Sequence, residues 1–71
     1  MSLRNRSWRE VVKALGHFDY HPVRQSGSHI ILKNSKGMVV SVPRYDPLPE
    51  GTLRAILEEA EIKREDFVKE L

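Results

Sequence analysis

A chain of 71 residues holds one domain and leaves no room for a second. Its hydrophobic fraction of 39% and charged fraction of 31% are typical of a folded globular domain, which excludes a disordered segment. The absence of cysteine excludes disulfides, thiolate metal ligands and cysteine nucleophiles. The three histidines (His17, His21 and His29) lack the paired spacing of a zinc motif. We therefore expect a single domain over residues 1–71, with no metal and no cofactor.

Targeting signals are also missing from the sequence. No apolar run approaches the roughly 18 residues that a membrane span needs. Arg4 and Arg6 are not followed by the apolar stretch of a signal peptide. We expect a cytoplasmic protein with no membrane partner, in which residues 1–6 form a flexible leader.

The net charge of +2 is unevenly divided along the chain. Residues 1–45 contain eight basic and two acidic residues, whereas residues 46–71 contain four basic and eight acidic ones. This division suits a protein with one face for a polyanion. Small domains also distribute charge unevenly by chance, so charge alone leaves both interpretations open.

The first predicted helix begins after Ser7. Ser7 and Glu10 have the spacing of a capping box, in which each side chain binds the backbone N–H of the other residue. Gly16 is expected to end the helix in a left-handed conformation. Between them an apolar stripe recurs at helical spacing, formed by Trp8, Val11, Val12 and Leu15. Trp8 is therefore expected to pack against the fold rather than stack on nucleic-acid bases.

From residue 18 to residue 42 the apolar period changes to two, which indicates strands. Residues 20–25 predict a first strand that lies at a sheet edge or starts after Pro22, and Ser26-Gly27 predicts a turn. In the second strand Ile30 and Leu32 face one way, while His29, Ile31 and Lys33 face the other.

A short loop at 34–37, with Gly37 at positive φ, leads to a third strand that Pro43 stops. A second helix is expected to be capped by Gly51 or Thr52. Its apolar stripe consists of Leu53, Ile56, Leu57 and Ala60. A third helix is predicted over residues 64–71, with Ile62 and Phe67 spaced as a hydrophobic staple.

The predicted order α-β-β-β-α-α indicates an α+β fold in which both main helices cover the same face of a three-stranded antiparallel sheet. The other face is left to solvent or a ligand. By strand alternation, that open face presents Arg24, His29 and Lys33, with Ile31 as an apolar exception.

Four short stretches, in this order and spacing, resemble the HicA (YcfA-like) toxins of bacterial toxin–antitoxin pairs. They are Val23-Arg24-Gln25 followed by Gly27-Ser28-His29, then Val42-Pro43-Arg44, then Gly51-Thr52-Leu53-Arg54-Ala55-Ile56-Leu57, then Ala60-x-Ile62. The resemblance extends from about Ser7 to the end of the chain. It differs in two places, because Tyr45 stands where many relatives have histidine and Glu61 stands where the family usually has the glycine that ends the second helix.

The resemblance implies an α-β-β-β-α fold like that of a double-stranded-RNA-binding domain. It also implies metal-independent cleavage of messenger RNA by the strand histidine, His29, and neutralisation by a HicB antitoxin. Tyr45 leaves no histidine for an auxiliary role at its position, and Glu61 would have to adopt a left-handed conformation at a cost of roughly 1 kcal/mol.

A single histidine is compatible with this chemistry, because RNA supplies its own nucleophile, the 2′-OH, and an imidazole exchanges protons near neutral pH. Arg24, Lys33 and Arg44 are candidates for binding phosphate, and Gly27 for allowing the RNA backbone to approach closely. Two alternatives remain: the strand cations are ordinary solubilising charges, or the domain binds double-stranded RNA without cleaving it. The acidic second and third helices disfavour the latter.

Overall fold

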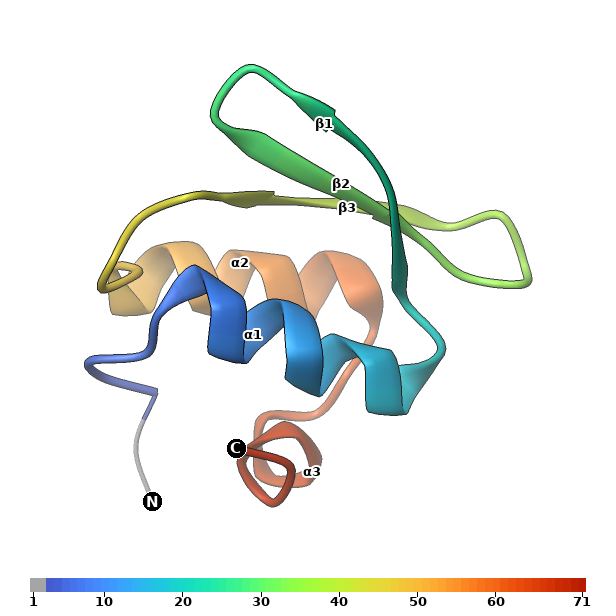
Figure 1. Ribbon diagram of the computed structural model, residues 1–71. Coiled ribbons are helices and arrows are strands. Elements are labelled where there is room, and N and C mark those ends of the chain that lie inside the picture. The colour runs from blue at the N-terminus through green and yellow to red at the C-terminus, as the bar shows by residue number, and fades with distance from the viewer. Residues whose placement is uncertain (1–2) are drawn as a thin grey trace.

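The computed structural model describes residues 3–71 and confirms the predicted layout (Figure 1). In chain order the elements are α1 (Trp8–Leu15), a 3-10 turn η1 (Gly16–Phe18), β1 (His21–Ser26), β2 (His29–Lys33), β3 (Val39–Pro43), α2 (Glu50–Ala60) and α3 (Arg64–Val68). Helices α1 and α2 lie on the same face of the sheet, and the short α3 lies beyond them (Figure 1). The result is an α+β fold like that of a double-stranded-RNA-binding domain. No helix within residues 3–71 is long and apolar enough to cross a bilayer.

The sheet is antiparallel with the order β1-β2-β3, so β1 is an edge strand as predicted. It begins before Pro22, and the register shifts between Pro22 and Arg24. An edge position explains how a proline is accommodated, because the missing N–H faces no neighbouring strand. The bulge also keeps Arg24 directly opposite Ile31.

The core lies between the sheet and the two helices. Leu32 pairs with Val40 and Ile30 with Val42, so these four side chains share the covered face. The buried apolar residues come from every main element except β1: Leu3, Val11, Ala14, Leu15, Tyr20, Leu32, Val40, Val42, Leu48, Leu53, Ile56, Leu57, Ala60, Phe67 and Val68.

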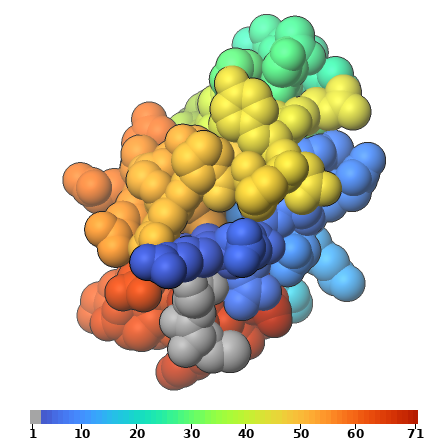
Figure 2. All heavy atoms as spheres, turned by 90° about the vertical axis from the view of Figure 1, so that its left-hand side faces the viewer, coloured from blue at the N-terminus to red at the C-terminus, as the bar shows by residue number. Residues whose placement is uncertain are grey.

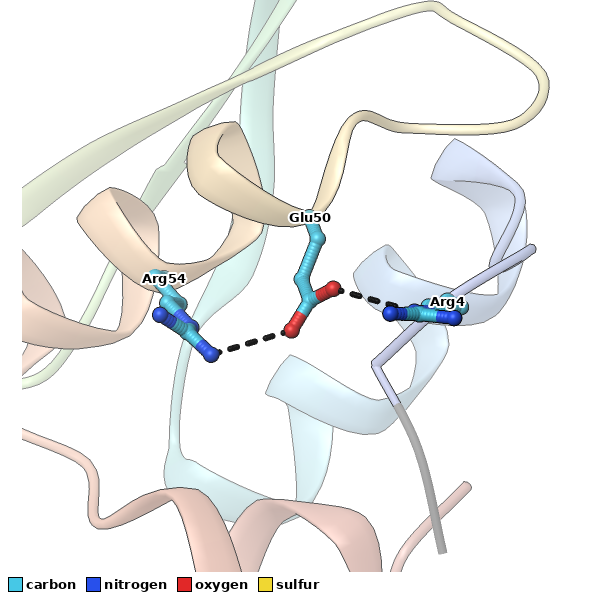
Figure 3. A network of polar contacts seen from close by, with 3 residues as sticks. All are labelled: Arg4, Glu50 and Arg54. Atoms are coloured by element: carbon cyan, nitrogen blue, oxygen red, sulfur yellow. Dashed lines mark hydrogen bonds and ion pairs between the residues drawn. The ribbon is translucent and has the colours of Figure 1, made fainter.

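Residues 3–6 pack against the domain, unlike the expected flexible leader; residues 1–2 of that leader lie outside the described part of the chain. Leu3 is completely buried, and the N–H of Leu48 donates to the carbonyl of Arg6 at 2.8 Å. Figure 3 shows the Glu50 carboxylate between two guanidinium groups, at 3.4 Å from Arg4 and 3.0 Å from Arg54. These contacts attach the N-terminal segment to the start of α2.

The capping box of α1 is confirmed, since the Glu10 N–H donates to Ser7 Oγ at 3.2 Å and the Ser7 N–H donates to the Glu10 carboxylate at 3.3 Å. The prediction for Gly16 is wrong. Gly16 keeps a right-handed φ of −60°, because the helix tightens into η1. The left-handed residue is Asp19, with φ 73°, and its short polar side chain tolerates that conformation.

The other helix boundaries differ in part from expectation. Neither Gly51 nor Thr52 caps α2, which begins at Glu50 after Pro49 and has no side-chain cap. Glu61 has φ 58° and ends α2 in the expected left-handed conformation. Helix α3 stops at Val68 rather than continuing to residue 71.

Candidate functional site

His29 is the first residue of β2, immediately after the turn that joins β1 to β2. It pairs with Ser26 of β1 and with Pro43 of β3, and it shares the open face of the sheet with Ile31 and Lys33. The side chain is exposed. Within residues 3–71 no side chain or backbone group forms a hydrogen bond or ion pair with the imidazole. Both ring nitrogens are therefore accessible to a bound molecule.

The turn before His29 consists of Gly27 and Ser28 rather than the expected Ser26-Gly27. Gly27 has φ 58° and Ser28 has no positive φ, which is the pattern of a type II′ hairpin turn with glycine at its first central position. The Gln25 Nε2 donates to the Gly27 carbonyl at 3.1 Å, and the Arg44 N–H donates to the Ser28 carbonyl at 2.7 Å. The glycine is thus needed for the backbone conformation that places His29 at the start of β2.

Two of the predicted phosphate-binding cations share the open face with His29, at different distances. Arg24 lies opposite Ile31, one diagonal position from His29, where strand geometry gives a Cα separation of about 7–8 Å. Lys33 lies four residues further along β2, at about 13 Å. Both side chains are exposed, and neither forms an ion pair within the described part of the chain. Arg24 is close enough to assist His29, whereas Lys33 can contact only a more distant part of a bound polymer.

Arg44 points elsewhere. It follows Pro43, the β3 partner of His29, but its guanidinium carbon lies 5.0 Å from the ring centroid of Trp8 at the start of α1. The guanidinium of Arg9 lies 4.7 Å from the same ring. Arg44 therefore stands at the edge between the open face and α1. Its backbone adjoins the start of β2, where His29 lies, and its guanidinium group lies over Trp8.

Sequence reasoning missed two features of this region. Trp8 is only half-buried and contacts two arginines, although its helical stripe correctly predicted packing against the core. The predicted strand over residues 20–25 includes His21 but did not place it on the open face, where it begins β1 and lies opposite Lys33. Strand alternation counted back from Arg24 would place His21 on the covered face, because the register shift between Pro22 and Arg24 reverses the phase of the strand.

The opposite end of the sheet contains a carboxylate with a structural role. Asp19 accepts hydrogen bonds from the Ser35 N–H at 2.9 Å and the Ser35 hydroxyl at 2.5 Å. These bonds lower the pKa of Asp19 below its ordinary value. Asp19 is thereby held as an anion that ties the end of η1 to the β2–β3 loop. Within residues 3–71, no three acidic or histidine side chains gather as metal ligands would.

The chain matches one protein-family model over residues 8–62, from the start of α1 to just beyond α2. The model describes the HicA toxin of bacterial toxin–antitoxin systems. The matched range includes Arg24, Gly27, His29, Lys33 and Arg44. No curated protein is similar enough to the chain to count as a match.

Proposed function

Since the chain belongs to the HicA family of toxins from bacterial toxin–antitoxin systems, we propose that it is an endoribonuclease that cleaves messenger RNA with His29 as its catalytic residue. The observation that supports this proposal most directly is the imidazole of His29, which is exposed on the open face of the sheet and has no hydrogen-bond or ion-pair partner among residues 3–71. The neighbouring Gly27 turn fixes its place, and Arg24 stands one diagonal position away.

The cleavage step needs no nucleophile from the protein. The 2′-oxygen of RNA attacks the adjacent phosphorus, the new 2′-O–P bond forms, and the bond from phosphorus to the 5′-oxygen breaks. His29 accepts the proton of the 2′-OH or donates one to the departing 5′-oxygen, and a group of this kind typically accelerates a reaction about 10²–10⁴-fold. The products are a 2′,3′-cyclic phosphate and a free 5′-OH.

Negative charge accumulates on the phosphate oxygens as the 2′-oxygen attacks. Arg24 is placed to offset that charge, and a guanidinium can bind two phosphate oxygens at once. Lys33, at the far end of β2, would hold a neighbouring phosphate and contribute to affinity and orientation. A Cβ built on Gly27 would meet no atom within 4 Å, so this side of the turn is open to an approaching polymer.

The partner of a toxin in such a system is an antitoxin, and we propose that a HicB-like protein covers the open face. That face combines cations with exposed apolar side chains, since Val39 pairs with Lys33 and is 54% exposed, and Ile31 is half-buried. An acidic surface with apolar residues at its centre would complement it and would block RNA.

The chemistry of the RNA ends tests the nuclease proposal. Incubation of the purified protein with a messenger RNA in EDTA should give fragments with 2′,3′-cyclic phosphate and 5′-OH ends. Loss of all cleavage in EDTA, or fragments with 5′-phosphate ends, would overturn it. A duplex-RNA mobility shift without any cleavage products would instead support a non-catalytic RNA-binding domain.

A further inference from the structure

Trp8, Arg9 and Arg44 form an arginine–tryptophan cluster beside the proposed active site. The two guanidinium carbons lie 4.7 Å and 5.0 Å from the centroid of the same indole ring, so they are no more than 9.7 Å apart. The ring is half-buried against the core, while both arginine side chains are exposed. A guanidinium that packs on an aromatic ring keeps its N–H groups available at its edge. The cluster therefore presents two sets of hydrogen-bond donors on a fixed aromatic base.

The two arginines have no neutralising partner within residues 3–71, and they repel each other. The carboxylate of Glu10, the residue after Arg9, is already bound to the Ser7 N–H and to Arg6. Arg9 also lies in the first turn of α1, where the helix dipole disfavours a cation. The repulsion between the two guanidinium groups and the unfavourable helix-dipole position of Arg9 would both be relieved by a bound anion. The cluster is therefore suited to an anionic ligand.

The cluster is continuous with the surface around His29. Pro43 pairs with His29, and the next residue, Arg44, donates its N–H to Ser28 in the turn before His29. Figure 1 shows the β1–β2 turn, the end of β3 and the start of α1 at the same end of the molecule. Figure 2, which faces that end, shows the turn (green) above the loop after β3 (yellow), with α1 (blue) beside it.

We propose that Trp8, Arg9 and Arg44 form a subsite that binds a nucleotide next to the cleaved bond of single-stranded RNA. The guanidinium edges bind its backbone phosphate, and the base stacks on the planar groups of the cluster. RNA is favoured over an acidic peptide because a nucleotide offers a phosphate and a flat base together, which match the donors and the planes of the cluster. The inference rests on the proposed ribonuclease function and extends it to a residue, Trp8, that does not touch the reacting atoms.

Binding is measured on the full chain with His29→Ala, which leaves the RNA uncut, using a labelled single-stranded RNA of about ten nucleotides. Arg9→Gln and Arg44→Gln should each reduce the slope of log affinity against log salt by about 0.7, as expected for the loss of one phosphate contact. The matched control Lys69→Gln removes the same charge at the end of α3, which lies beyond α1 and α2 from the sheet (Figure 1), and should leave the slope unchanged. Trp8→Leu should weaken binding at least about fivefold, and Trp8→Phe, which keeps a ring, should restore most of it. The emission of Trp8, the single tryptophan, should change on RNA binding.

Thermal melting identifies variants that fail to fold, and cleavage by the wild-type chain is measured in parallel. If the wild type cuts RNA but Arg9→Gln, Arg44→Gln and Trp8→Leu all bind RNA like Lys69→Gln, and RNA leaves the emission of Trp8 in the His29→Ala chain unchanged, the subsite is wrong and the proposed function stands. If the His29→Ala chain binds no RNA and the wild type cuts none, the proposed function fails. Variants that lose affinity for an antitoxin but not for RNA would also overturn the subsite, and would assign the cluster to the protein partner.

Discussion

His29 and His21 both lie exposed on the open face of the sheet, at opposite ends, and their neighbours distinguish them. His29 follows the Gly27 turn and has Arg24 one diagonal position away. His21 lies opposite Lys33, near the Asp19 carboxylate that Ser35 holds as an anion. A phosphate is therefore attracted to the first site more than to the second. Under the proposed nuclease function, His29 therefore has the surroundings expected of the catalytic histidine and His21 does not.

Glu61 provides a test of backbone strain. Its left-handed conformation permits the Ile62 N–H to bind the Leu57 carbonyl at 3.0 Å and its own N–H to bind the Glu58 carbonyl at 3.1 Å, a pairing that ordinarily uses glycine. We expect Glu61→Gly to raise the free energy of unfolding by up to about 1 kcal/mol, measured by urea denaturation. Glu58→Gly, inside α2, should lower it by about 1 kcal/mol. Equal destabilisation by both substitutions would contradict this account.

The Asp19–Ser35 hydrogen bonds predict a pH dependence. The pKa of Asp19 is lower in the folded chain than in the unfolded chain, so the unfolded chain binds the proton first as pH falls. The stabilisation is therefore complete above the ordinary pKa of about 4. It is lost as pH falls through the lowered pKa of the folded chain. Ser35→Ala removes the hydroxyl bond, the largest cause of the shift. The difference in urea midpoint between wild type and Ser35→Ala should therefore narrow as pH falls below about 4. A difference that stays constant or grows would show that the bond does not act through this carboxylate.

At the scale of elements, the sequence predicted the type and order of α1, the three strands, α2 and α3. It did so because the spacing of apolar residues in each segment matches the side that the segment buries in the fold. The capping box set the start of α1, and alternation placed His29 and Arg24 on the open face. Gly16 was misjudged because a right-handed 3-10 turn followed, and the left-handed conformation passed to Asp19. The direction of Arg44 could not be predicted, because it depends on where α1 places Trp8, a tertiary contact that no local pattern encodes.

The β1–β2 turn allows a matched comparison of two glycines. A Cβ would meet no atom within 4 Å at Gly27 or at Gly51, but only Gly27 has a positive φ. Gly27→Ala should cost roughly 1 kcal/mol of unfolding free energy through backbone strain. Gly51→Ala, in the first turn of α2, should be neutral or stabilising by up to about 1 kcal/mol. Chemical denaturation of both variants measures this, and a Gly27→Ala protein as stable as Gly51→Ala would contradict the turn assignment.

At the scale of the whole molecule, the stability of the domain depends on its N-terminal segment. The sequence did not indicate this, because one apolar residue forms no repeating pattern that would predict its burial. Leu3 is completely buried, so Leu3→Ala should lower the free energy of unfolding by about 2–5 kcal/mol. Val39→Ala, at a side chain 54% exposed, should change it by less than about 0.5 kcal/mol. Thermal or urea unfolding distinguishes the two variants. A Leu3→Ala protein with the wild-type free energy of unfolding would show that residues 3–6 do not stabilise the domain.

The nuclease account depends on one imidazole, and the rate of RNA cleavage by His29→Ala beside His21→Ala tests it most directly. Both substitutions remove an exposed histidine from the same sheet face, so general effects on charge and folding should be alike. We expect His29→Ala to lose about 10²–10⁴-fold in cleavage rate or more, with unchanged thermal melting, and His21→Ala to stay near the wild-type rate. A folded His29→Ala protein that cleaves RNA at the wild-type rate would contradict the account.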